Sequence, residues 1–177
     1  MDDQALEIEV VRSSGRVKTA SARWVEPGKK VLVRLPANLE AAEEQRLISQ
    51  LVAKVRAGTR RRDLNNEGKL PERASELNRR YFGGRLQLDS IEWVTNQQGR
   101  YGSCTPANRT IRISDRVASM PSWVQDYVLV HELAHLVQPN HSAAFWKLVN
   151  RYPLTERARG YLIAVGLEGM DGPGDDE

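Results

Sequence analysis

The sequence predicts an α+β protein that begins with a small antiparallel β meander. Apolar residues alternate with polar ones near the N-terminus, at Leu6, Ile8 and Val10, which is typical of a strand with one buried face. From about Asn38 onward, apolar residues recur at the spacing of helices. The chain has 177 residues, of which 40% are hydrophobic and 28% charged, so it has the size and composition of a globular protein.

The N-terminal part, residues 1–58, is expected to contain the meander and one long helix. Pro27 and Gly28 predict a tight turn between two of the strands. Asn38 is a candidate N-cap for the helix, because its side chain can accept a hydrogen bond from a backbone N–H of the first turn. Gly58 is expected to close the helix, since glycine is the residue that most often follows a helix end.

The remainder of the chain is expected to form three segments. A basic linker is predicted at residues 59–69, a second folded region at residues 70–168, and a short, acidic, flexible tail at residues 169–177. Within the second region the periodicity predicts a helix from about Pro71, several short strands and a buried helix. All of these segments are expected to belong to one compact unit.

Basic residues are concentrated in the middle of the chain. Residues 54–118 carry fourteen basic and seven acidic side chains. The densest cluster consists of Lys54, Arg56, Arg60, Arg61 and Arg62. This cluster is a candidate for weak contact with the phosphates of a nucleic acid. The alternative, a cationic helix end followed by a solvated linker, is favoured because no aromatic residue is interleaved with the basic ones.

Two further features of the sequence indicate the cellular compartment. Cys104 is the one cysteine of the chain, so no internal disulfide can form, and a reducing compartment such as the cytoplasm is expected. No apolar stretch has the length of a signal peptide or of a membrane-spanning helix. Secretion and membrane insertion are therefore not expected.

Two histidines and a glutamate lie in the middle of an otherwise apolar helix, predicted from Ser122 to Gln138. His131 and His135 are four residues apart, so they lie on one face of the helix and can point two imidazoles at one metal ion. Glu132 lies about 100° around the helix from His131, where its carboxylate can reach a water molecule on that ion. A buried helix should avoid unpaired ionisable groups, so this triplet indicates a metal site.

A catalytic zinc ion takes three protein ligands and keeps a fourth position for water. His141 is the candidate third ligand, because Pro139 ends the helix and lets the chain fold back. Glu156 is an alternative third ligand, although its basic neighbours indicate an exposed helix start. Cys104 is a candidate fourth ligand for a purely structural site. The predicted ligands of one Zn²⁺ per chain are His131, His135 and His141.

Glu132 is the predicted general base of a hydrolytic reaction. It would take a proton from the attacking water and pass it to the leaving amine. A tyrosine, an arginine, backbone N–H groups or the ion itself would stabilise the oxyanion. The candidates for contact with the oxyanion or the substrate are Arg100, Tyr101, Tyr127 and Tyr152. The segment Ile111–Ser114 is expected to offer a strand edge to an extended peptide.

Three motifs together resemble the YgjP-like family of zinc metallopeptidases and, more distantly, are similar to SprT-like zincins. They are the RYGSC segment at residues 100–104, the HELAH helix at residues 126–138, and the NHSxxFW stretch at residues 140–146. The resemblance covers about residues 70–167. It implies a zincin-like metallopeptidase fold, a peptide or protein substrate, the three histidines as zinc ligands, and Glu132 as catalytic acid and base.

The sequence departs from related patterns at two positions. Tyr101 stands where YgjP-like proteins typically carry tryptophan, which leaves open whether this position acts in chemistry or in packing. Gln138 stands where a metzincin requires glycine, so membership of that clan is not expected. Phe145 and Trp146 are expected to pack the His141 turn against the metal helix.

Three other functions remain as alternatives to a zinc-dependent peptidase. The first is a metal-dependent hydrolase of phosphoanhydrides or nucleotides, with arginines binding the phosphates. The second is a zinc protease associated with a nucleic acid through the basic cluster. The third is a zinc module without enzymatic activity, which requires a fourth protein ligand.

Overall fold

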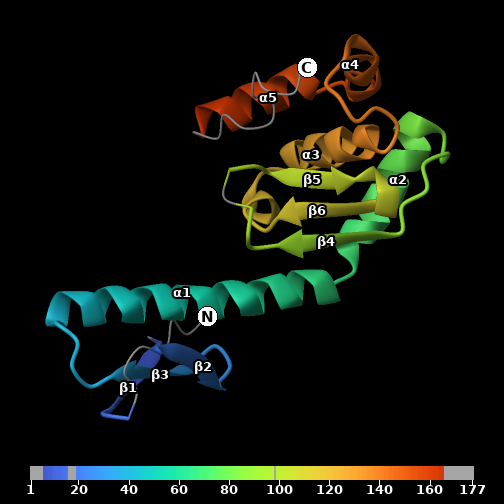
Figure 1. Ribbon diagram of the computed structural model, residues 1–177. Coiled ribbons are helices and arrows are strands. Elements are labelled where there is room, and N and C mark those ends of the chain that lie inside the picture. Colours follow the sequence, from blue (N-terminus) through green and yellow to red (C-terminus); the bar gives the residue numbers. More distant parts are fainter. Residues whose placement is uncertain (1–5, 16–18, 98, 166–177) are drawn as a thin grey trace. The chain divides into compact units, whose positions relative to one another are not determined.

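The computed structural model describes residues 6–15, 19–97 and 99–165 and shows an α+β protein, which confirms the predicted class (Figure 1). The predicted acidic tail at residues 169–177 lies outside the described residues. The chain divides into two compact units, Met1–Arg60 and Arg61–Glu177. Among the described residues, no helix is both long enough and apolar enough to cross a bilayer.

The first unit contains a mixed sheet of three strands, β1 (Glu7–Ser13), β2 (Ser21–Glu26) and β3 (Lys30–Pro36), in the order β1-β3-β2. β3 is parallel to β1 and antiparallel to β2, so the predicted antiparallel meander is wrong. The physical reason is the distribution of apolar residues. β3 is buried along most of its length, whereas β1 and β2 are mostly exposed, so the most apolar strand takes the central position.

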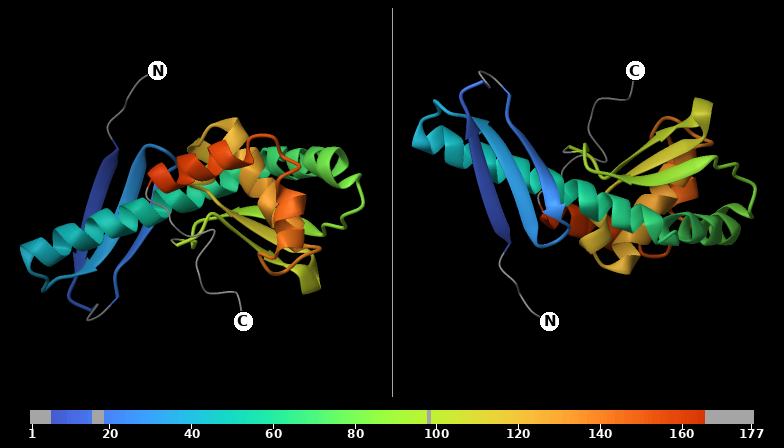
Figure 2. Two further views of the ribbon diagram at one scale, coloured as in Figure 1. Left: turned by 90° about the horizontal axis from the view of Figure 1, so that it is seen from above. Right: turned by 90° about the horizontal axis from the view of Figure 1, so that it is seen from below.

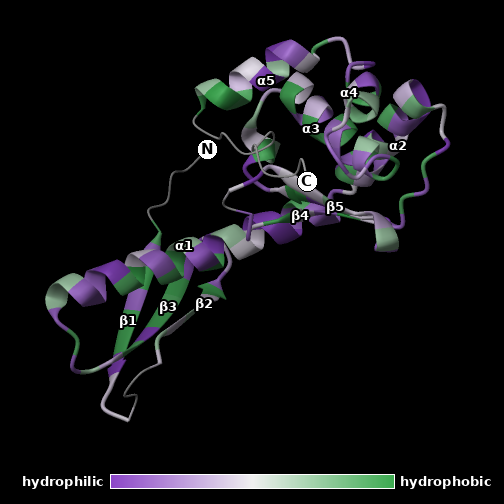
Figure 3. Cartoon of the chain, turned by 45° about the horizontal axis from the view of Figure 1, so that its top comes forward, coloured by the Kyte–Doolittle hydropathy of each residue, from purple (hydrophilic) through white to green (hydrophobic). Residues whose placement is uncertain are grey.

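Helix α1 (Ala41–Asn66) covers the apolar face of this sheet. Val31, Val33 and Leu35 of β3 are fully buried and share a core with Val52 of α1. Figure 3 shows β3 as a predominantly hydrophobic strand along this helix. The N-terminal unit therefore has a small hydrophobic core of its own.

Helix α1 continues eight residues beyond Gly58, so the predicted helix end is wrong and residues 59–66 of the predicted linker are helical. A glycine inside a helix costs only about 1 kcal/mol relative to alanine, and the arginines that follow are good helix formers. In addition, the Asn65 side chain hydrogen-bonds both backbone groups of Trp93, at 2.8 and 3.1 Å, which anchors the last turn. These contacts outweigh the local stop signal.

The second unit contains the sheet β4 (Ser90–Val94), β6 (Thr110–Ser114) and β5 (Gly102–Thr105), in the order β4-β6-β5. β6 is parallel to β4 and antiparallel to β5, which makes it the central strand. The prediction that Ile111–Ser114 offers a free edge is therefore wrong. Ile111 and Ile113 are fully buried, and two such residues favour the middle of a sheet over its edge.

Four helices pack around this sheet: α2 (Lys69–Phe82), α3 (Ser122–His135), α4 (Ala143–Val149) and α5 (Thr155–Ala164). α3 contacts β5, β6 and each of the other three helices, so it is the central element of the unit. Figure 2 shows α3, α4 and α5, in orange to red, grouped beside the sheet. Arg73 of α2 forms a bidentate ion pair with the buried Asp126 of α3, at 2.5 and 2.7 Å, which ties the two helices together.

Candidate metal centre

The three histidines of the chain converge on one point. His131 and His135 lie one turn apart on α3, and His141 lies in the loop between α3 and α4. The Nε2 atom of His131 is 3.2 Å from that of His135 and 3.2 Å from that of His141. Nitrogen ligands about 2.05 Å from a tetrahedral zinc ion lie about 3.3 Å apart, so the observed spacing fits a shared ion.

The hydrogen bond of His135 determines which ring nitrogen faces this point. Its Nδ1 lies 3.1 Å from the backbone carbonyl of Gln138. A carbonyl oxygen only accepts hydrogen bonds, so Nδ1 carries the proton and Nε2 offers its lone pair to the cluster. Burial, together with the neighbouring charges of His135, His141 and Arg159, holds the pKa of His131 well below its usual value. A neutral imidazole is the form that binds a metal.

Two aromatic residues of α4, Phe145 and Trp146, form a wall against the histidines, which we call the aromatic wall. The ring of Phe145 stacks on that of His135 at a centroid distance of 4.4 Å. Trp146 stacks on His141 at 5.9 Å. The chain reaches this position because Ser142 caps α4, its hydroxyl accepting a hydrogen bond from the Phe145 backbone N–H. The arrangement agrees with the packing role expected for these two aromatic residues.

Glu132 points from α3 toward strand β5. Its side chain is only 3% exposed, and it lies against the backbone of Gly102. A Cβ atom at position 102 would stand 2.7 Å from both Cγ and Cδ of Glu132 and would overlap its Oε1. Burial raises the pKa of Glu132 to about 8, although the charge of Arg100 acts in the opposite direction. Gly102 is not among the site residues predicted from the sequence. The signal that could have identified it is the presence of the smallest residue within the RYGSC segment.

The other residues predicted to contact the oxyanion or the substrate occupy different surroundings. Arg100 is exposed and close enough to Glu132 to affect its pKa. Tyr127 is fully buried, and its ring lies 6.0 Å from that of His131. Tyr152 donates a hydrogen bond of 2.9 Å to the backbone carbonyl of Trp123. The structure thus brings Arg100 and Tyr127 next to the motif, while Tyr152 lies between α4 and α5 and is hydrogen-bonded to α3.

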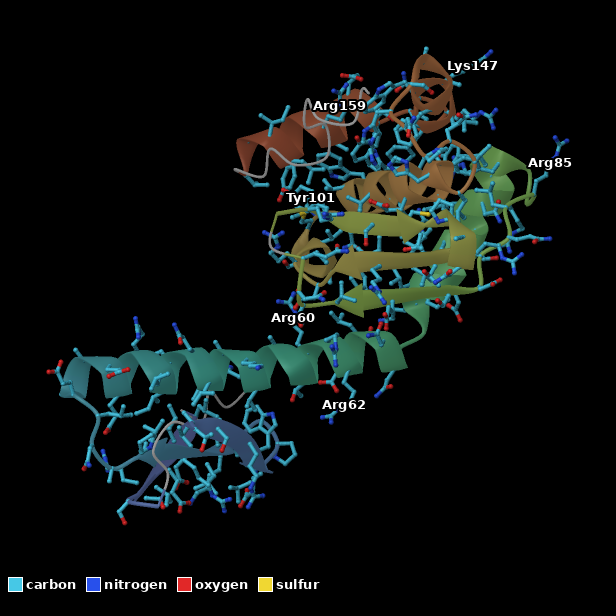
Figure 4. The ribbon with its side chains drawn as sticks, viewed as in Figure 1. Arg60, Arg62, Arg85, Tyr101, Lys147 and Arg159 are labelled. Carbon is cyan, nitrogen blue, oxygen red and sulfur yellow. The ribbon has the colours of Figure 1, made fainter. Side chains whose placement is uncertain are left out.

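Tyr101 lies in the core, one residue before β5 begins. It is fully buried, and among the described residues its hydroxyl has no hydrogen-bond partner. Figure 4 marks its position beside the sheet of this unit. The guanidinium carbon of Arg116 lies 5.7 Å from the centre of its ring. Burial raises the pKa of Tyr101, and the other causes are the charge of Arg116, which lowers it, and Tyr161 on α5. These contacts favour packing over chemistry at this position.

Neither Glu156 nor Cys104, the two alternative ligands, belongs to the histidine cluster. Among the described residues, the group that could share one metal ion consists of the three histidines. Glu156 lies in the first turn of α5 and forms an ion pair of 3.2 Å with Arg159. Cys104 lies on β5 with its side chain half-buried, and burial and the nearby Glu132 raise the pKa of its thiol to about 12. A fourth ligand that would close the site is therefore not found among the described residues.

The basic cluster predicted to contact nucleic acid is exposed on α1. Successive residues of a helix are separated by about 100°, so Arg60, Arg61 and Arg62 cannot share one narrow face. Figure 4 shows Arg60 and Arg62 on different sides of the helix. The cluster is therefore distributed around α1.

Comparison with known proteins agrees with this geometry. Residues 86–162, which include all three histidines and Glu132, match the YgjP-like metallopeptidase domain. Abylysin, a metallopeptidase of Pyrococcus abyssi solved as its zymogen, is similar over 54% of this chain and 90% of its own, with 21% identity and a TM-score of 0.46. No curated protein sequence matches the chain significantly. The chain carries a YgjP-like metallopeptidase domain. It is therefore a hydrolase of the peptidase class, as the motifs predict.

Proposed function

We propose that the protein is a zinc-dependent peptidase in which His131, His135 and His141 hold one zinc ion and Glu132 acts as general base. The observation that carries this proposal is the convergence of three imidazoles next to a buried carboxylate, with the Nε2 atom of His131 3.2 Å from that of His135 and 3.2 Å from that of His141. Imidazole nitrogens suit zinc, and three protein ligands leave one position open, as in catalytic zinc sites.

The ion would acidify a water molecule and polarise the carbonyl of the scissile bond. Glu132 takes the proton of this water on its carboxylate and then donates it to the leaving amine. Its burial supports this role, because a carboxylate in apolar surroundings binds a proton more readily than one in water. The contact with Gly102 limits the space in which the carboxylate can move.

We further propose that an extended peptide substrate lies along β5. β5 is an edge strand of its sheet, and Gly102 on this strand touches Glu132. An extended segment that pairs with a sheet edge gains main-chain hydrogen bonds whatever its side chains are. A peptide on this edge would present its backbone beside the proposed general base. Arg100, exposed just before β5, is the nearest predicted substrate contact on the same side.

Metal content and peptide turnover, measured on three variants, test this proposal. We expect about one zinc ion per chain in the wild type and a loss of the metal in His141→Ala. Glu132→Gln should retain the metal and lose hydrolysis of an unstructured protein such as casein. The matched control is Glu92→Gln, which changes an exposed carboxylate of β4 and should keep both properties. Wild-type turnover by Glu132→Gln would contradict the assigned mechanism.

A further inference from the structure

Arg116, in the connection between β6 and α3, holds the residues that come just before β5. Its Nη2 donates hydrogen bonds to the backbone carbonyl of Gln97, at 2.8 Å, and to that of Arg100, at 3.2 Å. Its Nε donates to the hydroxyl of Ser114, at 3.2 Å, and this serine is the last residue of the central strand β6. One side chain therefore joins the segment that enters β5 to the end of β6.

The acceptors that Arg116 uses are all neutral. Its hydrogen bonds go to two backbone carbonyls and one hydroxyl, and it forms no ion pair with a carboxylate of the described residues. Hydrogen bonds from an ionised donor are about twice as strong as those between neutral groups. The guanidinium carbon also lies 5.7 Å from the centre of the buried Tyr101 ring. The guanidinium is therefore used to fix the shape of the backbone around it.

Two further hydrogen bonds hold the same stretch of backbone. The Ser114 backbone N–H donates to the carbonyl of Tyr101, at 2.7 Å. The side-chain amide of Gln97 donates to the hydroxyl of Ser103, at 2.6 Å. Each bond starts from a residue that the guanidinium already contacts. The residues on both sides of Gly102 are thus held by one connected set of hydrogen bonds.

Gly102 is the point at which β5 meets the proposed general base. Its backbone lies against the side chain of Glu132, with no room for a Cβ atom between them. In Figure 1, β5 lies between β6 and α3, the helix that carries Glu132. β5 has only 4 residues and pairs with β6 alone, so its own ladder gives it little support. The place of Gly102 therefore depends on the anchors at the start of this strand.

We propose that Arg116 is a positioning residue that keeps Gly102 in contact with Glu132 and so fixes the proposed general base. This inference rests on the proposed peptidase function. Arg116 acts through the backbone that leads into β5, since its hydrogen bonds go to that backbone and to the end of β6. The same bonds fix the main chain of Arg100, the nearest predicted substrate contact.

Casein hydrolysis by two Arg116 variants tests the effect on the reaction. In Arg116→Gln we expect kcat to fall about tenfold, with a smaller change of KM and with wild-type zinc content, because a small displacement of a reacting group slows the chemical step. Arg116→Lys keeps the charge but not the planar group, so it should recover only part of kcat. The matched control is Arg112→Gln, which changes an exposed arginine of β6 that lies 3.5 Å from Glu92. This control should keep the wild-type kcat.

The double variant Arg116→Gln/Gly102→Ala distinguishes positioning of the base from a general loss of stability. If Arg116 acts through Gly102, the base is already displaced in Gly102→Ala, and the second change adds little. The combined loss of kcat should then be smaller than the product of the two single losses. Losses that multiply would overturn the proposal. So would a wild-type kcat in Arg116→Gln, or a loss of zinc from both Arg116 variants.

The thiol of Cys104 provides a readout that does not depend on activity. Cys104 lies on β5, two residues after Gly102, and is half-buried. Loss of the anchor should open this strand more often, so we expect 5,5′-dithiobis(2-nitrobenzoic acid) to react about tenfold faster in Arg116→Gln and at the wild-type rate in Arg112→Gln. A wild-type rate in Arg116→Gln would overturn the proposal. A wild type that hydrolyses no peptide would count against the peptidase function, while the thiol rates would still decide whether Arg116 holds β5.

Discussion

The side chain of Glu132 occupies the space that a Cβ atom at position 102 would need. With glycine there, the carboxylate lies directly on the backbone of β5. An added methyl group would stand 2.7 Å from Cγ and Cδ of Glu132, closer than real Cβ contacts come. The proposed general base is thus positioned by a residue on the neighbouring strand that contributes no side chain.

Gly102→Ala should therefore displace the carboxylate of Glu132 while the histidines stay in place. We expect kcat to fall by about a hundredfold, because a displacement of about 1 Å at a reacting group can have an effect of this size. Zinc content should remain at the wild-type level, and KM should change little. Steady-state kinetics and metal analysis on the same preparation provide the measurement.

Gly99→Ala is the matched control for this variant. Gly99 lies three residues earlier, and a Cβ atom there would meet nothing within 4 Å. This variant should keep the wild-type kcat. If Gly102→Ala also kept it, the contact with Glu132 would have no part in placing the base.

The convergence of the histidines could be anticipated from the sequence because it depends on local geometry. His131 and His135 follow the helical repeat, and Pro139 ends the helix before His141. The contact between Gly102 and Glu132 joins residues thirty positions apart. No periodicity within either segment encodes such a contact, since it depends on how β5 packs on α3.

The errors in the N-terminal unit have a similar cause. An antiparallel meander is the simplest arrangement of three successive strands, but β3 is more apolar than its neighbours and pairs with both of them. Gly58 is a local stop signal, whereas the contact that extends the helix, between Asn65 and Trp93, spans 28 residues. In both cases a contact between distant parts of the chain prevailed over a local preference.

Removal of the metal should lower the stability of the protein. A ligand that binds only the folded state stabilises it by about 2.7 kcal/mol when present at a hundred times its Kd. We expect treatment with 1,10-phenanthroline to lower Tm and to abolish peptide hydrolysis, and added zinc to restore both. His141→Ala, lacking one proposed ligand, should show no shift of Tm with the chelator. An equal shift in this variant would show that the chelator acts elsewhere.

Phe145→Ala should destabilise the fold and weaken metal binding together. Phe145 is fully buried, stacks on His135 and touches the rings of His131 and His141 edge-on. Replacing a buried phenylalanine by alanine costs about 3–5 kcal/mol of unfolding free energy. Denaturant unfolding measures this loss, and zinc titration measures the affinity. Phe145→Leu should recover most of the unfolding free energy but less of the zinc affinity, because leucine fills the buried volume without stacking on His135. Equal recovery of both quantities would show that the volume of the side chain alone matters.

Cys104 should react slowly with thiol reagents in the folded protein. Burial, and then the charge of Glu132, raise the pKa of its thiol to about 12 from a usual value of 9.0. The thiolate is the reactive form, so at pH 8 its fraction, and with it the rate of reaction, falls about a thousandfold. Reaction with 5,5′-dithiobis(2-nitrobenzoic acid), followed by absorbance, measures this rate, and the protein in guanidinium chloride provides the reference for an unprotected thiol. Glu132→Gln removes the charge of Glu132, the smaller of the two causes that raise the thiol pKa. This variant should therefore accelerate the reaction of Cys104 only modestly. A folded protein that reacts as fast as the denatured one would show that burial does not protect the thiol of Cys104.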